Sequence, residues 1–263
     1  DYLDSENKLN KYSVKKIKKN DYDIIGFSLN ANMLITNLLK SNDKNRNNIF
    51  QNNIALSINL DEVSLDEINY ISDLKGDLFI KDNSVVDANL SAFFDDKKNI
   101  SFSIKSDAAN NKITTLYSSK ANPIVERYKF INGFDEGYLD FYSSKKDNIS
   151  KSKLNIYDFK LKELPVLTKI LTLASLQGIA DILSGEGIRF DEFEMNFKNQ
   201  GDIMTIDEIY AIGPAISVLM SGYVEKDKLI SLRGTLVPAT TINKTISSIP
   251  VLGKILVGDK TGE

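Results

Sequence analysis

The sequence predicts a mostly β fold, in which a curled antiparallel β-sheet forms a β-groove accompanied by a few short amphipathic helices. Apolar and polar residues alternate with a period of two in several segments, and short polar turn signals separate these segments. Hydrophobic residues make up 42% of the 263 residues and charged residues 26%, which is typical of a folded chain. Helical periodicity occurs in only a few places, so we expect strands to dominate.

The strands are predicted from alternation, and their apolar members are expected to share one face of the sheet. The most regular segments contain Ile54, Leu56, Ile58 and Leu60; Ile100, Phe102 and Ile104; Leu154 and Ile156; and Phe193, Met195 and Phe197. Further strands are predicted at 24–30, 76–81, 85–93, 112–118, 137–143, 203–211, 215–224 and 228–237. Since short polar turns join these segments, we expect neighbouring strands to pair antiparallel.

Four short segments have helical patterns. Residues 32–40 place leucines on one side, and residues 123–130 begin with proline at a favourable first position. The longest helix is predicted at 165–183, where a broad apolar stripe ends before a glycine. Lys169 and Asp181 interrupt this stripe, which argues against a membrane-spanning helix. Residues 240–248 are the fourth candidate.

Domain organisation is expected to be simple, because no segment rich in Gly, Pro or Ser divides the chain. A soft boundary near 145–152 separates a β-groove segment (1–150, with helices near 32–40 and 123–130) from a second region (151–263, with helix 165–183, antiparallel strands and a terminal helical segment). We expect both to form one continuous unit. The chain begins with Asp1 and shows no signal peptide, so we interpret it as a piece of a longer protein.

Composition excludes many kinds of active site. There is no His, no Cys and no Trp, so imidazole bases, thiol nucleophiles and His or Cys metal ligands are absent. Adjacent carboxylates such as Asp95 and Asp96 point to opposite faces of a strand, so we interpret them as solvated charges. The 33 basic and 36 acidic residues give a net charge of −3, which disfavours nucleic acid as a partner. We predict a protein without enzymatic activity, cofactor or metal.

The sequence contains one run of basic residues and one internal repeat, and each of them has two possible interpretations. Lys15, Lys16, Lys18 and Lys19 fit a solvated strand edge that discourages pairing with other sheets, or a contact for anionic lipid headgroups. Residues 164–171 and 249–256 share a Pro-Val-Leu pattern followed by Lys-Ile-Leu. They are either two similar helix starts or a repeated element that contacts lipid.

Motifs between residues 164 and 263 carry a family resemblance. They include Leu164-Pro165-Val166-Leu167, Leu173-Ala174-Ser175-Leu176, Asp181-Ile182-Leu183-Ser184-Gly185-Glu186-Gly187-Ile188, Gly213-Pro214-Ala215, Leu232-Arg233-Gly234-Thr235-Leu236-Val237-Pro238-Ala239 and Ile249-Pro250-Val251-Leu252-Gly253. These motifs resemble the C-terminal region of AsmA-like proteins, whose larger relatives include TamB and YhdP. Upstream of residue 164, only the rhythm of strands and short helices looks similar.

The resemblance implies a location and a function. AsmA-like proteins belong to the envelope of Gram-negative bacteria, where an N-terminal helix tethers them to the inner membrane and the rest lies in the periplasm. Their repeating β-groove is linked to phospholipid transport towards the outer membrane and to outer-membrane biogenesis. The implied partners are phospholipids, the inner and outer membranes, and envelope proteins. No active-site residue is known for the family, so none is carried over to this chain.

A groove of this kind needs only an apolar interior. Moving a two-tailed phospholipid with ~30 methylenes from a bilayer into water costs about 20 kcal/mol, and an apolar surface removes most of that barrier. The expected lipid-facing residues are Ile54, Leu56, Ile58, Ile100, Phe102, Ile104, Leu154, Ile156, Phe193, Met195 and Phe197. Two alternatives stay open. One is a scaffold that pairs its sheet edge with strands of outer-membrane proteins, and the other is an enzyme on envelope glycans with two facing carboxylates.

Overall fold

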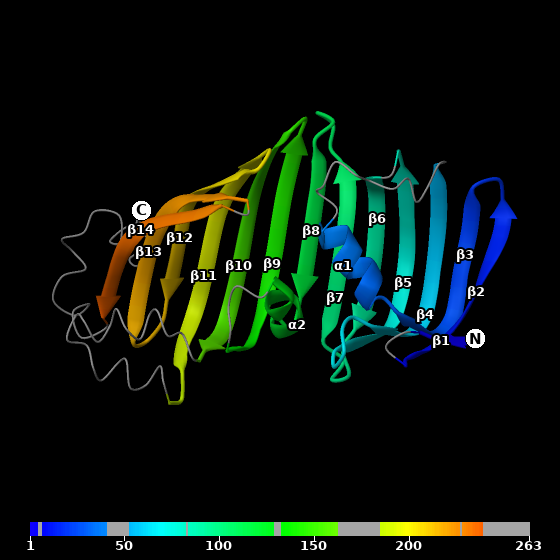
Figure 1. The fold of residues 1–263 in the computed structure, drawn as a ribbon, viewed down its shortest axis with the longest axis horizontal. Helices are drawn as coiled ribbons and strands as arrows, with labels where there is room; N and C mark the ends of the chain where they lie inside the picture. The colour runs from blue at the N-terminus through cyan, green and yellow to red at the C-terminus, as the bar shows by residue number, and fades with distance from the viewer. Residues whose placement is uncertain are drawn as a thin grey trace, which may run out of the picture.

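Fourteen strands form one sheet in this computed structural model, and every strand lies beside its neighbour in chain order (Figure 1). The structure describes residues 1–4, 7–40, 53–82, 84–128, 133–162, 185–226 and 228–238, without the side chains of residues 37–40 and 128. The sheet is curled and unclosed, with β1 at one edge and β14 at the other. The predicted fold class is therefore confirmed.

In the described part of the chain, strands follow one another with few helices. The strands are β1 (Tyr2–Leu3), β2 (Leu9–Lys18), β3 (Asp21–Asn30), β4 (Ile54–Ser64), β5 (Tyr70–Lys81), β6 (Ser84–Phe93), β7 (Asn99–Ser106), β8 (Lys112–Ser118), β9 (Phe134–Lys146), β10 (Ile149–Leu161), β11 (Ile188–Gln200), β12 (Ile203–Ile212), β13 (Ile216–Glu225) and β14 (Leu229–Pro238). The helices are α1 (Asn32–Lys40), α2 (Asn122–Val125) and the 3-10 helix η1 (Glu126–Tyr128). Each predicted strand has a counterpart, and α1 has the predicted bounds.

One strand pair departs from the expected antiparallel pattern. β3 and β4 run parallel, with Ile24 opposite Ile58. A parallel pair needs a connection that returns the chain to the side where the first strand began, and α1 lies in this connection. Period-two alternation is the same in parallel and antiparallel strands, so the sequence pattern alone did not predict this pair.

The two ends of the strands differ, and we name them by their connections. At the turn end, short turns follow β2, β5, β7, β9, β11 and β13. At the helix end lie α1 and α2 with η1, and β10 ends and β11 begins there. The soft boundary predicted at 145–152 falls in the β9–β10 turn, and the ladder there is continuous.

Within the described helices, none is long and apolar enough to span a membrane.

Three clusters of buried apolar residues stabilise the sheet. One joins β4, β5 and β6 around Leu60 and Val63, which are 1% and 2% exposed. The largest joins β9, β10 and β11 to α2, and the third lies around Phe197 and Ile206 on β11 and β12.

The predicted helices at 165–183 and 240–248, and the repeat at 164–171 and 249–256, lie outside the described residues.

Candidate functional site

Rows of apolar side chains cross the sheet on one face, which we call the apolar face. Side chains directly opposite each other on paired strands point to the same side of a sheet. The strand registers therefore place on this face a central row of Ile58, Gly76, Leu90, Phe102, Leu116, Phe141, Leu154, Met195, Ile209 and Met220. This row passes through ten consecutive strands, from β4 to β13, without a charged residue.

All eleven residues expected to face lipid lie on the apolar face. Leu56 and Ile104 belong to the row beside the central row, and Ile100, Ile156 and Phe193 belong to the row on its other side. Ile54 lies opposite Ile80, and Phe197 opposite Ser152. Ile104, Ile156 and Phe197 are buried, and the other eight side chains are half-buried.

Three aromatic residues of the apolar face were missing from the sequence prediction. Phe134, Phe159 and Phe190 form a ladder across β9, β10 and β11, with ring centroids 5.2 and 5.3 Å apart and nearly parallel planes. Strict alternation assigns Ile156 and Phe159 to opposite faces, but both belong to one buried cluster. The register of β10 with β9 and β11 is the same on both sides of Asp158, so no residue is inserted. Asp158 has a left-handed φ of 52°, and this local change of the backbone interrupts the alternation. In the sequence, the three-residue spacing from Ile156 to Phe159 was the signal that could have identified Phe159 as a residue of the apolar face.

Helix α2 closes the apolar face at the helix end. Ala121, Pro123 and Val125 are buried, and Val125 packs in the same cluster as Leu139 and Ile156. Pro123 lies in the first turn of this helix, as the sequence predicts, because proline lacks the N–H that the first turn leaves unpaired. The predicted helix at 123–130 is thus present as α2 followed by η1.

Arg127 in η1 connects distant segments of the helix end. One guanidinium nitrogen donates to the carbonyl oxygen of Leu65 at 2.6 Å, in the β4–β5 connection. The other donates to the backbone and side-chain oxygens of Asn32 and to the hydroxyl of Thr36, at 2.8–2.9 Å. Since Asn32 and Thr36 belong to α1, this side chain holds α1, η1 and the β4–β5 connection together.

The opposite face of the sheet, which we call the polar face, is lined by tyrosines and charged residues. Tyr138 and Tyr157 stack with ring centroids 4.9 Å apart. Glu194 forms an ion pair with Lys153 at 2.6 Å and accepts hydrogen bonds from Asn196 and Tyr210. Burial and the nearby carboxylates raise the pKa of Tyr210 well above its ordinary value, so this phenol stays protonated.

Cavities of about 620 and 230 Å³ open on this side. Tyr117 lines both cavities, and Asp135 and Glu136 line the larger one. These two carboxylates form ion pairs with Lys162 at 3.0 Å and Arg189 at 2.8 Å. The hydrogen bond from Lys162 lowers the pKa of Asp135. The general acid of a glycosidase needs a raised pKa. Among the described residues, every carboxyl group whose pKa is shifted has a lowered pKa.

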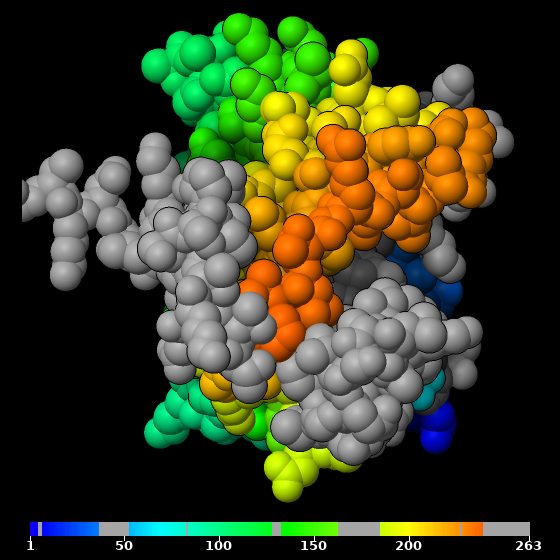
Figure 2. Space-filling view, turned by 90° about the vertical axis from the view of Figure 1, so that its left-hand side faces the viewer, coloured from blue at the N-terminus to red at the C-terminus, as the bar shows by residue number. Residues whose placement is uncertain are grey.

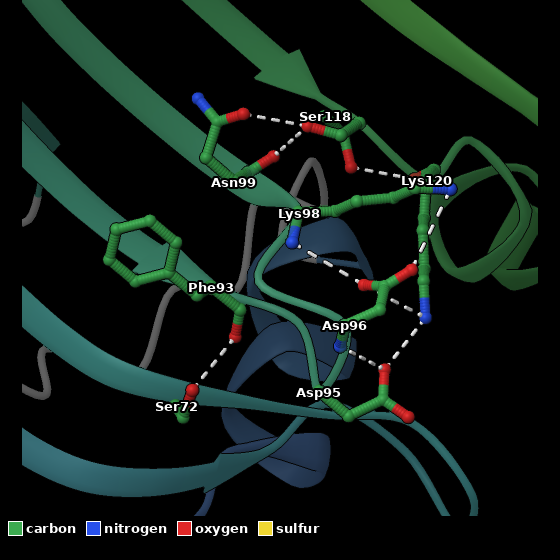
Figure 3. A network of polar contacts seen from close by, with 9 residues as sticks. Ser72, Phe93, Asp95, Asp96, Lys98, Asn99, Ser118 and Lys120 are labelled. Carbon is green, nitrogen blue, oxygen red and sulfur yellow. Dashed lines mark hydrogen bonds and ion pairs between the residues drawn. The ribbon is translucent and has the colours of Figure 1, made fainter.

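Asp95 and Asp96, adjacent carboxylates noted in the sequence, form a surface ion-pair network at the helix end (Figure 3). Lys120 lies 2.8 Å from Asp95 and 3.4 Å from Asp96, and Lys98 lies 3.6 Å from Asp96. These charges join the β6–β7 connection to the segment after β8. In the described part of the chain, no three carboxylates gather in a group that could hold a metal ion.

The four lysines expected to contact headgroups lie at the β2 edge of the sheet. Lys15 is opposite Asp23 and Lys16 is opposite Tyr22, so these neighbours point to different faces. Lys18 forms an ion pair with Asp21 at 3.2 Å, and Lys19 begins the turn into β3. β1 pairs only with Leu9 and Asn10, which leaves the lysine-rich part of β2 as the strand edge. The structure thus places Lys15 and Lys16 on opposite faces of the sheet.

Comparison with known proteins found no match for this chain. No family model matches it, and neither a curated protein nor a solved structure does. The arguments for function therefore depend on the residues and their geometry.

Proposed function

We propose that this protein presents the apolar face of its sheet to the acyl chains of phospholipids and moves them without enzymatic chemistry. The observation that carries the proposal is the central row of apolar side chains, which crosses ten strands without a charge. Such a row replaces contact between lipid and water by contact between lipid and side chain along its whole length. The unclosed sheet leaves the polar headgroup a way to stay in water.

The resemblance of residues 164–263 to AsmA-like proteins supports the same role. On this proposal the chain acts in the periplasm of a Gram-negative bacterium, as part of a protein tethered to the inner membrane. It carries phospholipids between the inner and outer membranes, and other envelope proteins assist it. No catalytic residue, cofactor or metal takes part.

Native mass spectrometry of the protein, purified without strong detergent, tests the proposal. We expect phospholipid adducts on the wild-type chain and their loss in Leu56→Asp and Phe102→Asp, because each variant puts a charge on the apolar face. Asn59→Asp and Ser101→Asp are matched controls, since both exposed residues lie on neighbouring positions that point to the polar face. Thermal unfolding of all four variants measures folding separately. Adducts that persist in both apolar-face variants would refute lipid binding at this face.

A second candidate function, a scaffold for outer-membrane proteins, is favoured by β14, which is an edge strand of the sheet formed by the described residues. This strand pairs with β13 on one side, and its Leu229, Ile230 and Leu232 are 48%, 68% and 42% exposed. Figure 2 views the molecule from this end, where the orange strands face the viewer. An exposed edge strand offers unpaired backbone groups to a strand from another chain.

A further inference from the structure

Each strand from β9 to β14 begins with a large apolar residue, and the exposure of that residue depends on the end of the sheet where it lies. The first residues of β9, β11 and β13 lie at the helix end and are buried: Phe134, Ile188 and Ile216. The first residues of β10, β12 and β14 lie at the turn end, and they are Ile149, Ile203 and Leu229, which are 42%, 49% and 48% exposed. Core packing therefore accounts for the apolar residues at the helix end but not for those at the turn end.

The three exposed residues belong to one row across the sheet, which we call the turn-end row. Ile149 and Ile203 both lie opposite Gln200 of β11, and Ile203 and Leu229 both lie opposite Glu225 of β13. Side chains opposite each other point to the same side of a sheet, which is here the polar face. The turns after β9 and β11 lie along the upper rim of the sheet in Figure 1, away from α2.

Lysines surround the first apolar residue of this row. Lys145 and Lys146 precede Ile149, Lys151 follows it, and all three lysines are exposed. Asp147 is the one carboxylate within residues 145–151, so the β9–β10 turn has an excess of positive charge. Exposed apolar side chains beside lysines are typical of surfaces that lie at the interface of a bilayer, where the apolar groups enter and the ammonium groups stay at the headgroups.

The spacing of the turn-end row favours a bilayer over a protein as its partner. Strands are about 4.8 Å apart, so the apolar side chains on alternate strands are about 10 Å apart. Gln200 and Glu225 lie between them, and Glu225 forms an ion pair with Lys228 at 2.5 Å. A protein partner would need a separate pocket for each apolar side chain, whereas a fluid bilayer admits each side chain independently.

We infer that the turn end of β9 to β14 rests on the surface of an anionic phospholipid bilayer. The three apolar residues of the turn-end row enter the headgroup region, and the lysines of the β9–β10 turn lie beside the lipid phosphates. The excess of positive charge selects anionic over zwitterionic lipid. This contact goes beyond the proposed function, because it orients the strands relative to a membrane and uses residues outside the central row.

Flotation of the full chain with large unilamellar vesicles tests the contact. One vesicle preparation is dioleoyl phosphatidylcholine alone, and the other contains dioleoyl phosphatidylcholine and dioleoyl phosphatidylglycerol in equal parts. The variants are I149S/I203S and K145Q/K146Q. Their matched controls at the helix end are Ile68→Ser and K97Q/K98Q, since all three control residues are exposed. Thermal unfolding measures folding separately, and Leu229→Ser replaces I149S/I203S if that variant folds poorly.

We expect wild type to bind the mixed vesicles about tenfold more tightly than phosphatidylcholine vesicles, and each double variant to bind the mixed vesicles about tenfold more weakly than wild type. The controls should bind like wild type. A folded double variant that binds like wild type, or a control that weakens as much as its variant, would overturn the contact. Leu56→Asp should keep vesicle binding, so that failure of the proposed function and failure of this contact are distinguishable.

Discussion

Glu194 illustrates how a single carboxylate is tuned on the polar face of the sheet. Its side chain is 14% exposed, and burial by itself opposes ionisation. Hydrogen bonds from Lys153, Asn196 and Tyr210 outweigh that effect, so the pKa of Glu194 lies below its ordinary value. The ionised form is therefore more favourable in the folded chain than in the unfolded chain.

This shift predicts a pH-dependent contribution to stability. A lowered carboxyl pKa adds stability above the unfolded pKa of about 4.3, and that stability is lost as the pH falls through the folded value. We expect Glu194→Gln to reduce the free energy of unfolding by about 1 kcal/mol at pH 7, with a difference that disappears near pH 3. Urea unfolding at both pH values measures this, with exposed Asp191→Asn as the control. A penalty of equal size at pH 3 would show that lost packing, not charge, is the cause.

Among the elements, β10 shows how one left-handed residue changes which side chains share a face. Asp158 has a left-handed φ of 52° between Ile156 and Phe159, and both of these side chains belong to the buried cluster of the apolar face. The consequence is a well-packed aromatic ladder at the helix end of the sheet. By contrast, Phe102 in the central row is half-buried. Burial therefore differs between these two aromatic residues of the apolar face.

This difference predicts unequal costs for truncating the two aromatic residues. Phe159, 3% exposed, packs between two rings, so Phe159→Ala should cost about 3–5 kcal/mol of unfolding free energy. Phe102→Ala should cost about 1–2 kcal/mol, because less of its surface is removed from water. Chemical denaturation of both variants, with Phe159→Leu as the conservative control, gives the comparison. Equal losses would mean that the central row is packed as tightly as the ladder.

For the whole molecule, the unclosed sheet leaves two edges of different character. The exposed part of β2 carries Lys15, Lys16 and Lys18, which oppose pairing with another sheet. β14 has Arg233 as its one charged residue and exposes several apolar side chains. New strands are therefore expected to add at β14 rather than at β2.

The asymmetry predicts self-association through β14. Analytical ultracentrifugation of the wild-type chain should show association that increases with concentration, since β14 is the edge strand of the sheet in the described part of the chain. The double variant S231K/T235K places two lysines at exposed positions of this strand and should remain monomeric at the same concentrations. Ser101→Lys, on the central strand β7, is the control. Identical sedimentation of wild type and S231K/T235K would contradict pairing at this edge.

The sequence by itself determined the strands from β3 to β14, several of their bounds and the shared face of the eleven predicted apolar residues, whereas β1 and β2 were not predicted. Alternation is a local property, and side chains two residues apart point the same way in any strand. Only the tertiary structure decided the parallel pairing of β3 with β4, the inward turn of Phe159, and the meeting of Arg127 with α1. It also placed Ile149 and Ile203 in one row at the turn end of the sheet. Register, bulges and long-range contacts depend on which segments pair, and period-two alternation is compatible with many pairings.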